Sequence, residues 1–141
     1  MSAPEMPFRW PVRVYVEDTD AGGIVFYANY LKFFERARTE LVRSLGVSLR
    51  GGLEQGVSFV VHSLNLRYHQ PAYLDDALWI TAEPIEVKRS FMRFRQQAWR
   101  AGDEVLLAEG DVKVACVQLP EGRPRRLPRE LAEVLASYTQ S

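Results

Sequence analysis

The chain has 141 residues, of which 47% are hydrophobic and 26% are charged, a balance typical of one folded domain and not of a disordered chain. Lysine and arginine together number 18, as do aspartate and glutamate, so the net charge of zero argues against nucleic acid or a membrane surface as a partner. The single cysteine, Cys116, and a start without a signal-peptide pattern predict a cytoplasmic protein, and no apolar run is long enough for membrane insertion. We expect one domain over residues 1–141, with residues 1–7 as a flexible arm.

The first part of the chain predicts a strand followed by a long helix. Residues 9–16 alternate in polarity, and Pro11 restricts this strand to an edge, a start or a bulge. From about residue 28 to 45 apolar side chains recur three or four positions apart, which is the period of a helix. Asn29 is the best N-cap candidate, and a start one turn earlier near Tyr27 also fits.

The remainder predicts an antiparallel meander, because no second long helix interrupts it. A break is expected at Gly51 and Gly52, and a bulge at Pro84. The strand that starts at Val57 is expected to be buried on both sides near its start. We expect strands over residues 57–68, 78–87, 91–99 and 106–116, and a short terminal helix over residues 129–138. The fold class is therefore α+β, with a long helix wrapped by an antiparallel sheet.

The joint between the first strand and the helix carries the groups best suited to chemistry. Asp18 and Asp20 stand in an acidic turn, and Gly22 and Gly23 allow a tight turn and a close approach of a ligand to the backbone. A carboxylate just before a helix faces unpaired N–H groups and the positive end of the helix dipole, so Asp20 can stay ionised in a partly buried site. We expect this loop to be the active site, although position alone does not separate the two aspartates.

The same residues allow other interpretations. The aspartates could be plain turn formers, and a calcium loop would need an acidic residue where Asn29 stands. The histidines, His62 and His69, stand on a strand or at its end, and the sequence offers no metal-ligand set. Cys116 alternates with apolar neighbours and is expected in the core.

Two basic clusters could bind phosphate groups. One consists of Lys88 and Arg89 before Ser90, and the other contains Arg125 and Arg126. Cationic side chains at the mouth of a pocket suit a ligand that bears several phosphates, whereas the alternative is a solvated loop. Both clusters are too short for a nucleic-acid surface.

The stretch Arg-Val-Tyr-Val-Glu-Asp-Thr-Asp-Ala-Gly-Gly-Ile-Val-Phe-Tyr-Ala-Asn-Tyr at residues 13–30 strongly resembles the signature of the 4-hydroxybenzoyl-CoA thioesterase family, which has the hotdog fold. Residues 8–13, 33–40 and 71–76 resemble its Tol-Pal-associated acyl-CoA thioesterase branch, the YbgC type. The resemblance covers most of the chain. It implies a curled antiparallel sheet of about five strands around the helix, and an acyl-CoA thioesterase with no metal and no bound cofactor.

The resemblance also implies roles for individual residues. The catalytic aspartate of the family maps onto Asp20, and the backbone N–H that polarises the thioester carbonyl maps onto Tyr27. Relatives often carry histidine at the position of Tyr27, so no side-chain role is transferred to it. The expected substrate-binding residues are Gly22, Gly23, Lys88, Arg89, Ser90, Arg125 and Arg126.

The implied partners are an acyl-CoA substrate, with short or aromatic acyl groups preferred over long ones, and further copies of the chain. Protomers of the family pair their sheet edges, place the active sites at the interface, and often form tetramers. Acyl carrier protein is an alternative carrier of the acyl group. Two alternative functions are a hydroxyacyl-thioester dehydratase, for which no histidine is expected near the loop, and a non-catalytic acyl-thioester-binding or scaffold protein of the cell-envelope and lipid-synthesis machinery.

Overall fold

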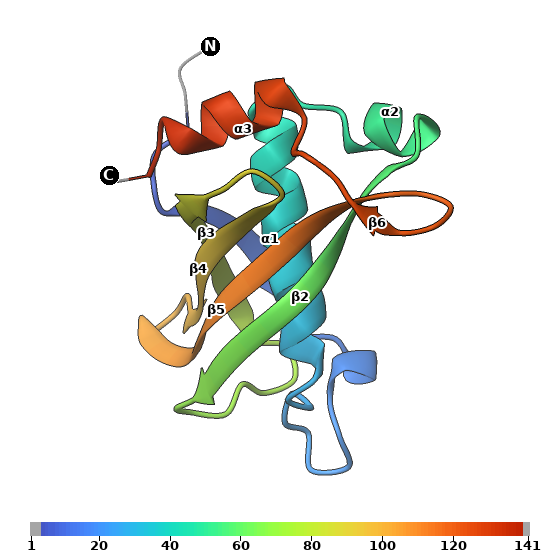
Figure 1. The fold of residues 1–141 in the computed structure, drawn as a ribbon. Coiled ribbons are helices and arrows are strands. Elements are labelled where there is room, and N and C mark those ends of the chain that lie inside the picture. Colours follow the sequence, from blue (N-terminus) through green and yellow to red (C-terminus); the bar gives the residue numbers. More distant parts are fainter. Residues whose placement is uncertain (1–3, 140–141) are drawn as a thin grey trace.

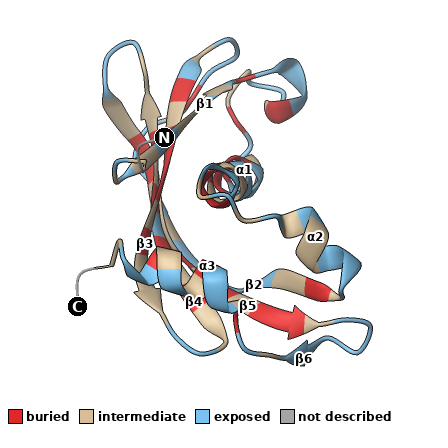
Figure 2. Cartoon of the chain, turned by 90° about the horizontal axis from the view of Figure 1, so that it is seen from above, coloured by how far each residue is buried: buried red, intermediate tan, exposed pale blue. Residues whose placement is uncertain are grey.

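The computed structural model describes residues 4–139 of the chain. The apolar stripe predicted as a helix forms α1 (Asn29–Ser44), whose side chains Phe33, Phe34, Ala37 and Leu41 are fully buried. Figure 2 looks along α1 and shows the sheet curling around it. The α1 side chains thereby fill the hollow of the sheet, which explains why the stripe is so wide.

Antiparallel strands form one curled sheet in the order β1-β3-β4-β5-β2, and the two-residue strand β6 pairs with β5 (Figure 1). The strands are β1 (Phe8–Arg13), β2 (Val57–Tyr68), β3 (Ala77–Val87), β4 (Phe91–Arg100), β5 (Val105–Gln118) and β6 (Arg123–Pro124). The predicted α+β class and the predicted meander are confirmed.

Two prolines act where the sequence predicted. Pro11 lies in β1, which is an edge strand with β3 as its single neighbour in the sheet order. The pairing of β3 with β4 shifts register between Pro84 and Glu86. An edge strand and a bulge both tolerate proline, which has no N–H to donate to a ladder.

Some local expectations are wrong. Val16 lies in a 3₁₀ helix (Val16–Asp18) and is 71% exposed, because β1 already ends at Arg13. Gly51 and Gly52 do not form a break between secondary-structure elements. They lie within the short helix α2 (Leu49–Glu54), where the Ser48 hydroxyl accepts from the Gly51 N–H at 2.9 Å. Asn29 is not the N-cap of α1, since Ala28 holds that position and the Asn29 amide donates to a backbone carbonyl instead.

Strand β2 leaves one edge of the sheet open. Val60, Val61 and Leu64 are 46%, 46% and 41% exposed, so the expected burial on both sides is wrong for a single protomer. The strand pairs with β5 on one side, and within residues 4–139 no strand pairs with its other side. A long apolar edge of this kind is a template for pairing with another chain.

The remaining segments are those near the two termini. Helix α3 (Arg129–Ala136) forms where the sequence predicted a terminal helix, and its Leu131 and Leu135 are fully buried. Cys116 is buried, as expected. Residues 1–3 of the expected arm lie outside the described residues, and Met6 is partly buried against the core.

No helix in residues 4–139 combines the length and the hydrophobicity needed to cross a bilayer.

Candidate active site

The two aspartates of the motif lie on a short hairpin that leads into α1. At its base the Phe26 N–H donates to the Asp18 carbonyl at 3.0 Å, and nearer the tip the Asp20 N–H donates to the Ile24 carbonyl at 2.9 Å. Gly23 has a φ of +77°, a left-handed conformation that glycine adopts without strain. Because the second arm runs directly into the first turn of α1, these hydrogen bonds link the backbone of Asp20 to the residues that lead into the helix.

Asp18 and Asp20 occupy different environments. The Asp18 side chain is buried, accepts a hydrogen bond from the Tyr15 N–H at 2.9 Å and lies 3.6 Å from the Lys32 ammonium group. Asp20 is exposed, and its Oδ1 accepts from the Gly22 N–H at 2.8 Å. Within residues 4–139 no hydrogen-bond donor contacts its Oδ2. Asp18 is therefore bonded within the fold, whereas Asp20 has one carboxylate oxygen without a hydrogen-bond donor among the described residues.

The backbone at the start of α1 has unpaired donors. Within the described part of the chain, no acceptor is bonded to the N–H groups of Tyr27 or Ala28. Asn29, the first helical residue, already donates to the Phe26 carbonyl at 2.8 Å. Free N–H groups together with the positive end of a helix dipole favour an oxygen that carries negative charge.

A mostly apolar pocket of about 300 Å³ adjoins the hairpin and the helix start. Its tyrosines contact one another: the Tyr68 hydroxyl donates to the Tyr27 carbonyl at 3.3 Å, and the Tyr68 and Tyr30 ring centroids are 5.7 Å apart. Burial raises the pKa of Tyr30 to about 12 and also raises that of Tyr68, so both hydroxyls are neutral at neutral pH. The lining residues are Ile24, Val25, Tyr27, Tyr30, Tyr68, His69, Gln70 and Pro71.

His69 shares this pocket with Tyr27, so the expectation that no histidine stands near the loop is wrong. Its Nε2 lies 3.2 Å from the Glu109 carboxylate on the neighbouring strand β5. The position of His69 at the end of a strand was predicted. What the sequence could not show is that the end of β2 returns to the start of α1.

The basic clusters come together in space, at some distance from the hairpin. The Arg89 carbonyl accepts from the Leu127 N–H at 2.8 Å, which joins the β3–β4 turn to the segment after β6. The Arg125 guanidinium is used within the protein, because it donates to Gln118 Oε1 at 3.1 Å and to the Arg126 carbonyl at 2.8 Å. Among the expected phosphate ligands, Lys88, Arg89 and Arg126 are exposed and Ser90 is partly buried.

These clusters lie at the end of α1 opposite the Asp20 hairpin (Figure 1). The 16 residues of α1 separate the two ends, and a helix of that length spans about 24 Å. One protomer therefore does not bring Asp20 and the basic clusters to a single site.

A second cavity of about 310 Å³ lies between α1, α2 and β2, and no sequence pattern predicted it. Arg38 of α1 lines it and donates to Gln96 Oε1 at 2.8 Å. The fully buried Gln96 amide donates in turn to the carbonyls of Phe34 and Thr81. Burial lowers the pKa of Arg38. Within residues 4–139 no group of three or more metal-ligating side chains is clustered.

Comparison with known proteins gives this geometry a class. The sequence pattern of the thioesterase superfamily matches residues 22–107. The acyl-CoA thioesterase YbgC of Haemophilus influenzae is 46% identical over 125 residues, which cover 88% of this chain and 90% of that protein. The acyl-CoA thioester hydrolase YbgC of Escherichia coli O6:H1 is 44% identical over 124 residues, which cover 88% and 92%.

Solved structures agree with this. A probable thioesterase from Bartonella henselae is 33% identical with a TM-score of 0.76, over 85% of this chain and 96% of that chain. The 1,4-dihydroxy-2-naphthoyl-CoA thioesterase Slr0204 of Synechocystis, at 22% identity, shares the fold with a TM-score of 0.84 over 92% of this chain and 95% of that one. The fold is thus the hotdog fold, and the protein is by class a thioester hydrolase. The chain belongs to the thioesterase superfamily, which confirms the resemblance to this family and its YbgC branch.

Proposed function

We propose that the protein hydrolyses acyl-CoA thioesters to a free acid and CoA, with Asp20 as the reacting carboxylate and the Tyr27 N–H at the oxyanion position. The observation that carries the proposal is the exposed Asp20 carboxylate, with one unbonded oxygen, on a hairpin that continues into a helix start with unpaired N–H groups. The names of the YbgC relatives support acyl-CoA as the substrate.

In the proposed reaction the thioester carbonyl oxygen accepts from the Tyr27 N–H, and the helix dipole stabilises the negative charge that develops on it. Asp20 acts in one of two ways. Its carboxylate attacks the carbonyl carbon and expels the CoA thiolate, and water then hydrolyses the resulting anhydride to free acid and aspartate. Alternatively it takes a proton from a water molecule that attacks the carbon, and the departing thiolate receives that proton.

The proposed active unit contains two protomers. The open, apolar edge of β2 supports pairing with a second copy. A twofold axis through this edge makes the paired β2 strands antiparallel, so the end of one protomer that carries Lys88 and Arg89 lies beside the Asp20 end of the other. The substrate would then bind with its nucleotide on one protomer and its thioester at Asp20 of the other, and Gly22 and Gly23 would let it approach the backbone.

The pocket at the helix start supports a preference for short or aromatic acyl groups. It is bounded by Tyr27, Tyr30 and Tyr68, whose rings suit a planar group, and its volume is about 300 Å³. We expect turnover of benzoyl-type and short acyl-CoAs to exceed that of long-chain acyl-CoAs. Thiol release across such a panel, with acyl carrier protein thioesters in parallel, measures both the acyl preference and the carrier.

Replacement of the proposed reacting group tests the mechanism. Asp20→Asn keeps the shape of the side chain and removes its charge, so we expect turnover to fall at least about a hundredfold with the fold intact. Glu17→Gln is the matched control, because Glu17 is a neighbouring exposed carboxylate just before the hairpin. Near-normal thiol release by Asp20→Asn would contradict the proposal.

Mixed dimers test whether the site is shared. Homodimers of the Asp20→Asn variant should have low activity at low substrate concentration, and so should homodimers of the Lys88→Glu/Arg89→Glu variant. In a mixed dimer one site combines the intact Asp20 of one chain with the intact basic cluster of the other, so activity should return on mixing. If each protomer used its own cluster, mixing would restore nothing.

One structural feature supports the alternative function, the dehydration of hydroxyacyl thioesters. His69 and Glu109 form a histidine–carboxylate pair at the pocket, which is a group that such chemistry can use. An assay for an enoyl product from 3-hydroxyacyl-CoA, with wild type beside His69→Ala, decides between the two reactions.

We further propose a cytoplasmic dimer or tetramer that acts with the Tol-Pal system. The buried free thiol of Cys116 supports a reducing compartment, the open β2 edge supports the oligomer, and the likeness of residues 33–40 and 71–76 to the Tol-Pal-associated branch supports the context. Light scattering after size-exclusion chromatography measures the assembly, and cell fractionation measures the location.

A further inference from the structure

A segment outside the motif holds the second arm of the Asp20 hairpin. The Val25 N–H donates to the Ala72 carbonyl at 2.8 Å, and the Leu74 N–H donates to the Gly23 carbonyl at 3.1 Å. This arm therefore lies between two partners, with the Asp20 arm on one side and residues 72–74 on the other. A displacement of residues 72–74 would move the hairpin, and with it both the Asp20 carboxylate and the helix start.

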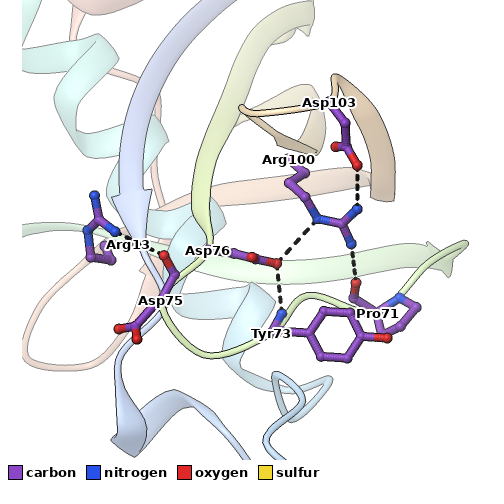
Figure 3. A network of polar contacts seen from close by, with 7 residues as sticks. All are labelled: Arg13, Pro71, Tyr73, Asp75, Asp76, Arg100 and Asp103. Carbon is purple, nitrogen blue, oxygen red and sulfur yellow. Dashed lines mark hydrogen bonds and ion pairs between the residues drawn. The ribbon is translucent and has the colours of Figure 1, made fainter.

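Arg100 at the end of β4 holds this segment together with Asp76 (Figure 3). The Asp76 carboxylate accepts from the Tyr73 N–H at 2.9 Å and from Arg100 Nε at 3.3 Å. A second nitrogen of the same guanidinium donates to the Pro71 carbonyl at 2.8 Å. The Arg100 and Asp76 side chains are only 22% and 23% exposed, so water screens their interaction less than that of a surface pair.

Two further contacts restrict the same turn. Asp103 accepts from the outer nitrogen of Arg100 at 2.8 Å, and this bond holds the pKa of Asp103 below its usual range. Asp75 has a φ of +70°, a left-handed conformation unusual for aspartate, and its carbonyl accepts from Arg13 at 2.9 Å. Contacts on both sides of the turn therefore restrain its backbone.

We infer that Arg100 and Asp76 are positioning residues for the active site, which act on Asp20 and the Tyr27 N–H through the backbone of residues 72–74. The inference rests on the proposed role of Asp20. Neither side chain lines the pocket at the helix start, so each acts through the turn and not on the substrate. A misplacement of reacting groups by about 1 Å can lower the rate about a hundredfold. The contacts of Arg100 with Asp76 and the Pro71 carbonyl can therefore affect turnover although they lie outside the pocket.

The test compares matched arginine variants on one strand. Arg93 also lies on β4 and also contacts two carboxylates, Glu86 and Asp111, but far from the 71–76 turn along the strand. We expect Arg100→Gln and Asp76→Asn to lower kcat at least about tenfold with KM within about twofold, and Arg93→Gln to leave both within about twofold. Arg100→Lys keeps the charge but cannot hold Asp76 and the Pro71 carbonyl in the same geometry, so its kcat should lie between those of Arg100→Gln and wild type. This variant keeps the test valid if Arg100→Gln folds poorly.

Two readouts separate positioning from plain stabilisation. Hydrogen exchange at the Val25 and Leu74 amides should accelerate in Asp76→Asn under conditions where the rest of the sheet stays protected. In an Asp20→Asn background, Asp76→Asn should lower the residual turnover by a smaller factor than in wild type, because the part of its effect that passes through Asp20 is already lost and only the part that passes through the Tyr27 N–H remains. An equal loss in both backgrounds, or a normal kcat with accelerated exchange, would overturn the inference.

The outcome also distinguishes this inference from the proposed function. If Asp20→Asn alone retains normal turnover, the proposed function fails, whatever the Asp76 variant does. If Asp20→Asn is inactive but Asp76→Asn and Arg100→Lys both keep the kcat of wild type, the positioning role alone is refuted.

Discussion

Replacement of Asp18 by alanine should weaken folding far more than catalysis, and the same change at Asp20 should do the reverse. The two aspartates are two positions apart, but Asp18 is buried and bonded to Tyr15 and Lys32, whereas Asp20 is exposed. Asp18→Ala removes a hydrogen bond to a charged group, worth about 1.5–3 kcal/mol of the free energy of unfolding. The ammonium group of Lys32 is about half exposed, so its ion pair adds less than about 1 kcal/mol.

The expected loss for Asp18→Ala is thus about 2–4 kcal/mol, which lowers the urea midpoint by about 1–2 M at a slope of about 2 kcal/mol/M. Asp20→Ala loses two solvent-exposed hydrogen bonds, from the Gly22 N–H at 2.8 Å and from the Ile24 N–H at 3.4 Å, which together contribute about 1 kcal/mol. Urea unfolding at fixed protein concentration measures both changes, since assembly would make the midpoint depend on concentration.

Turnover below the unfolding transition completes the comparison. Asp18→Ala should keep kcat within about tenfold of wild type, and Asp20→Ala should lose at least about a hundredfold. An Asp18→Ala protein that unfolds at the wild-type urea concentration and yet loses as much turnover as Asp20→Ala would refute the division of roles between the two carboxylates.

Three further predictions concern the core and the sheet. The raised pKa of Tyr30, about 12 against 10.0, stabilises the fold fully below about pH 10, and this contribution of up to about 2.7 kcal/mol is lost as the pH rises toward 12. Urea unfolding of wild type beside Tyr30→Phe across that range should show a larger loss of stability in wild type, because Tyr68, whose pKa is also raised, remains in the variant. The buried Cys116 thiol, whose pKa burial raises, should react with an aromatic disulfide reagent at least about a hundredfold more slowly in native than in urea-unfolded protein, followed by absorbance. Gly110→Ala would press a methyl group against Leu66 and within 3.1 Å of the Asn65 carbonyl, and it should cost about 1–3 kcal/mol of stability in thermal or urea unfolding.

Much of the local structure follows from residues a few positions apart. The period of the apolar side chains determines α1, because a helix side chain meets its neighbours three and four positions away. Pro84 determines the bulge in β3 in the same local way. Even so, such rules misplaced Gly51 and Gly52, which were expected to break the chain and instead lie in α2, where packing against β2 and the Ser48 cap outweigh the low helix propensity of glycine.

The acidic, glycine-bearing turn before α1 was recognisable from the sequence by itself, together with the family signature that singles out Asp20. Only the tertiary structure decided that Asp18 is buried and that His69 shares a pocket with Tyr27. It also decided that Arg100 donates to Asp76 and to the Pro71 carbonyl, in the turn that pairs with the hairpin. The physical reason is that burial and pocket composition depend on which strand ends meet, and the order β1-β3-β4-β5-β2 brings together residues dozens of positions apart. For the same reason the two basic clusters meet each other, but at the end of α1 that lies away from Asp20.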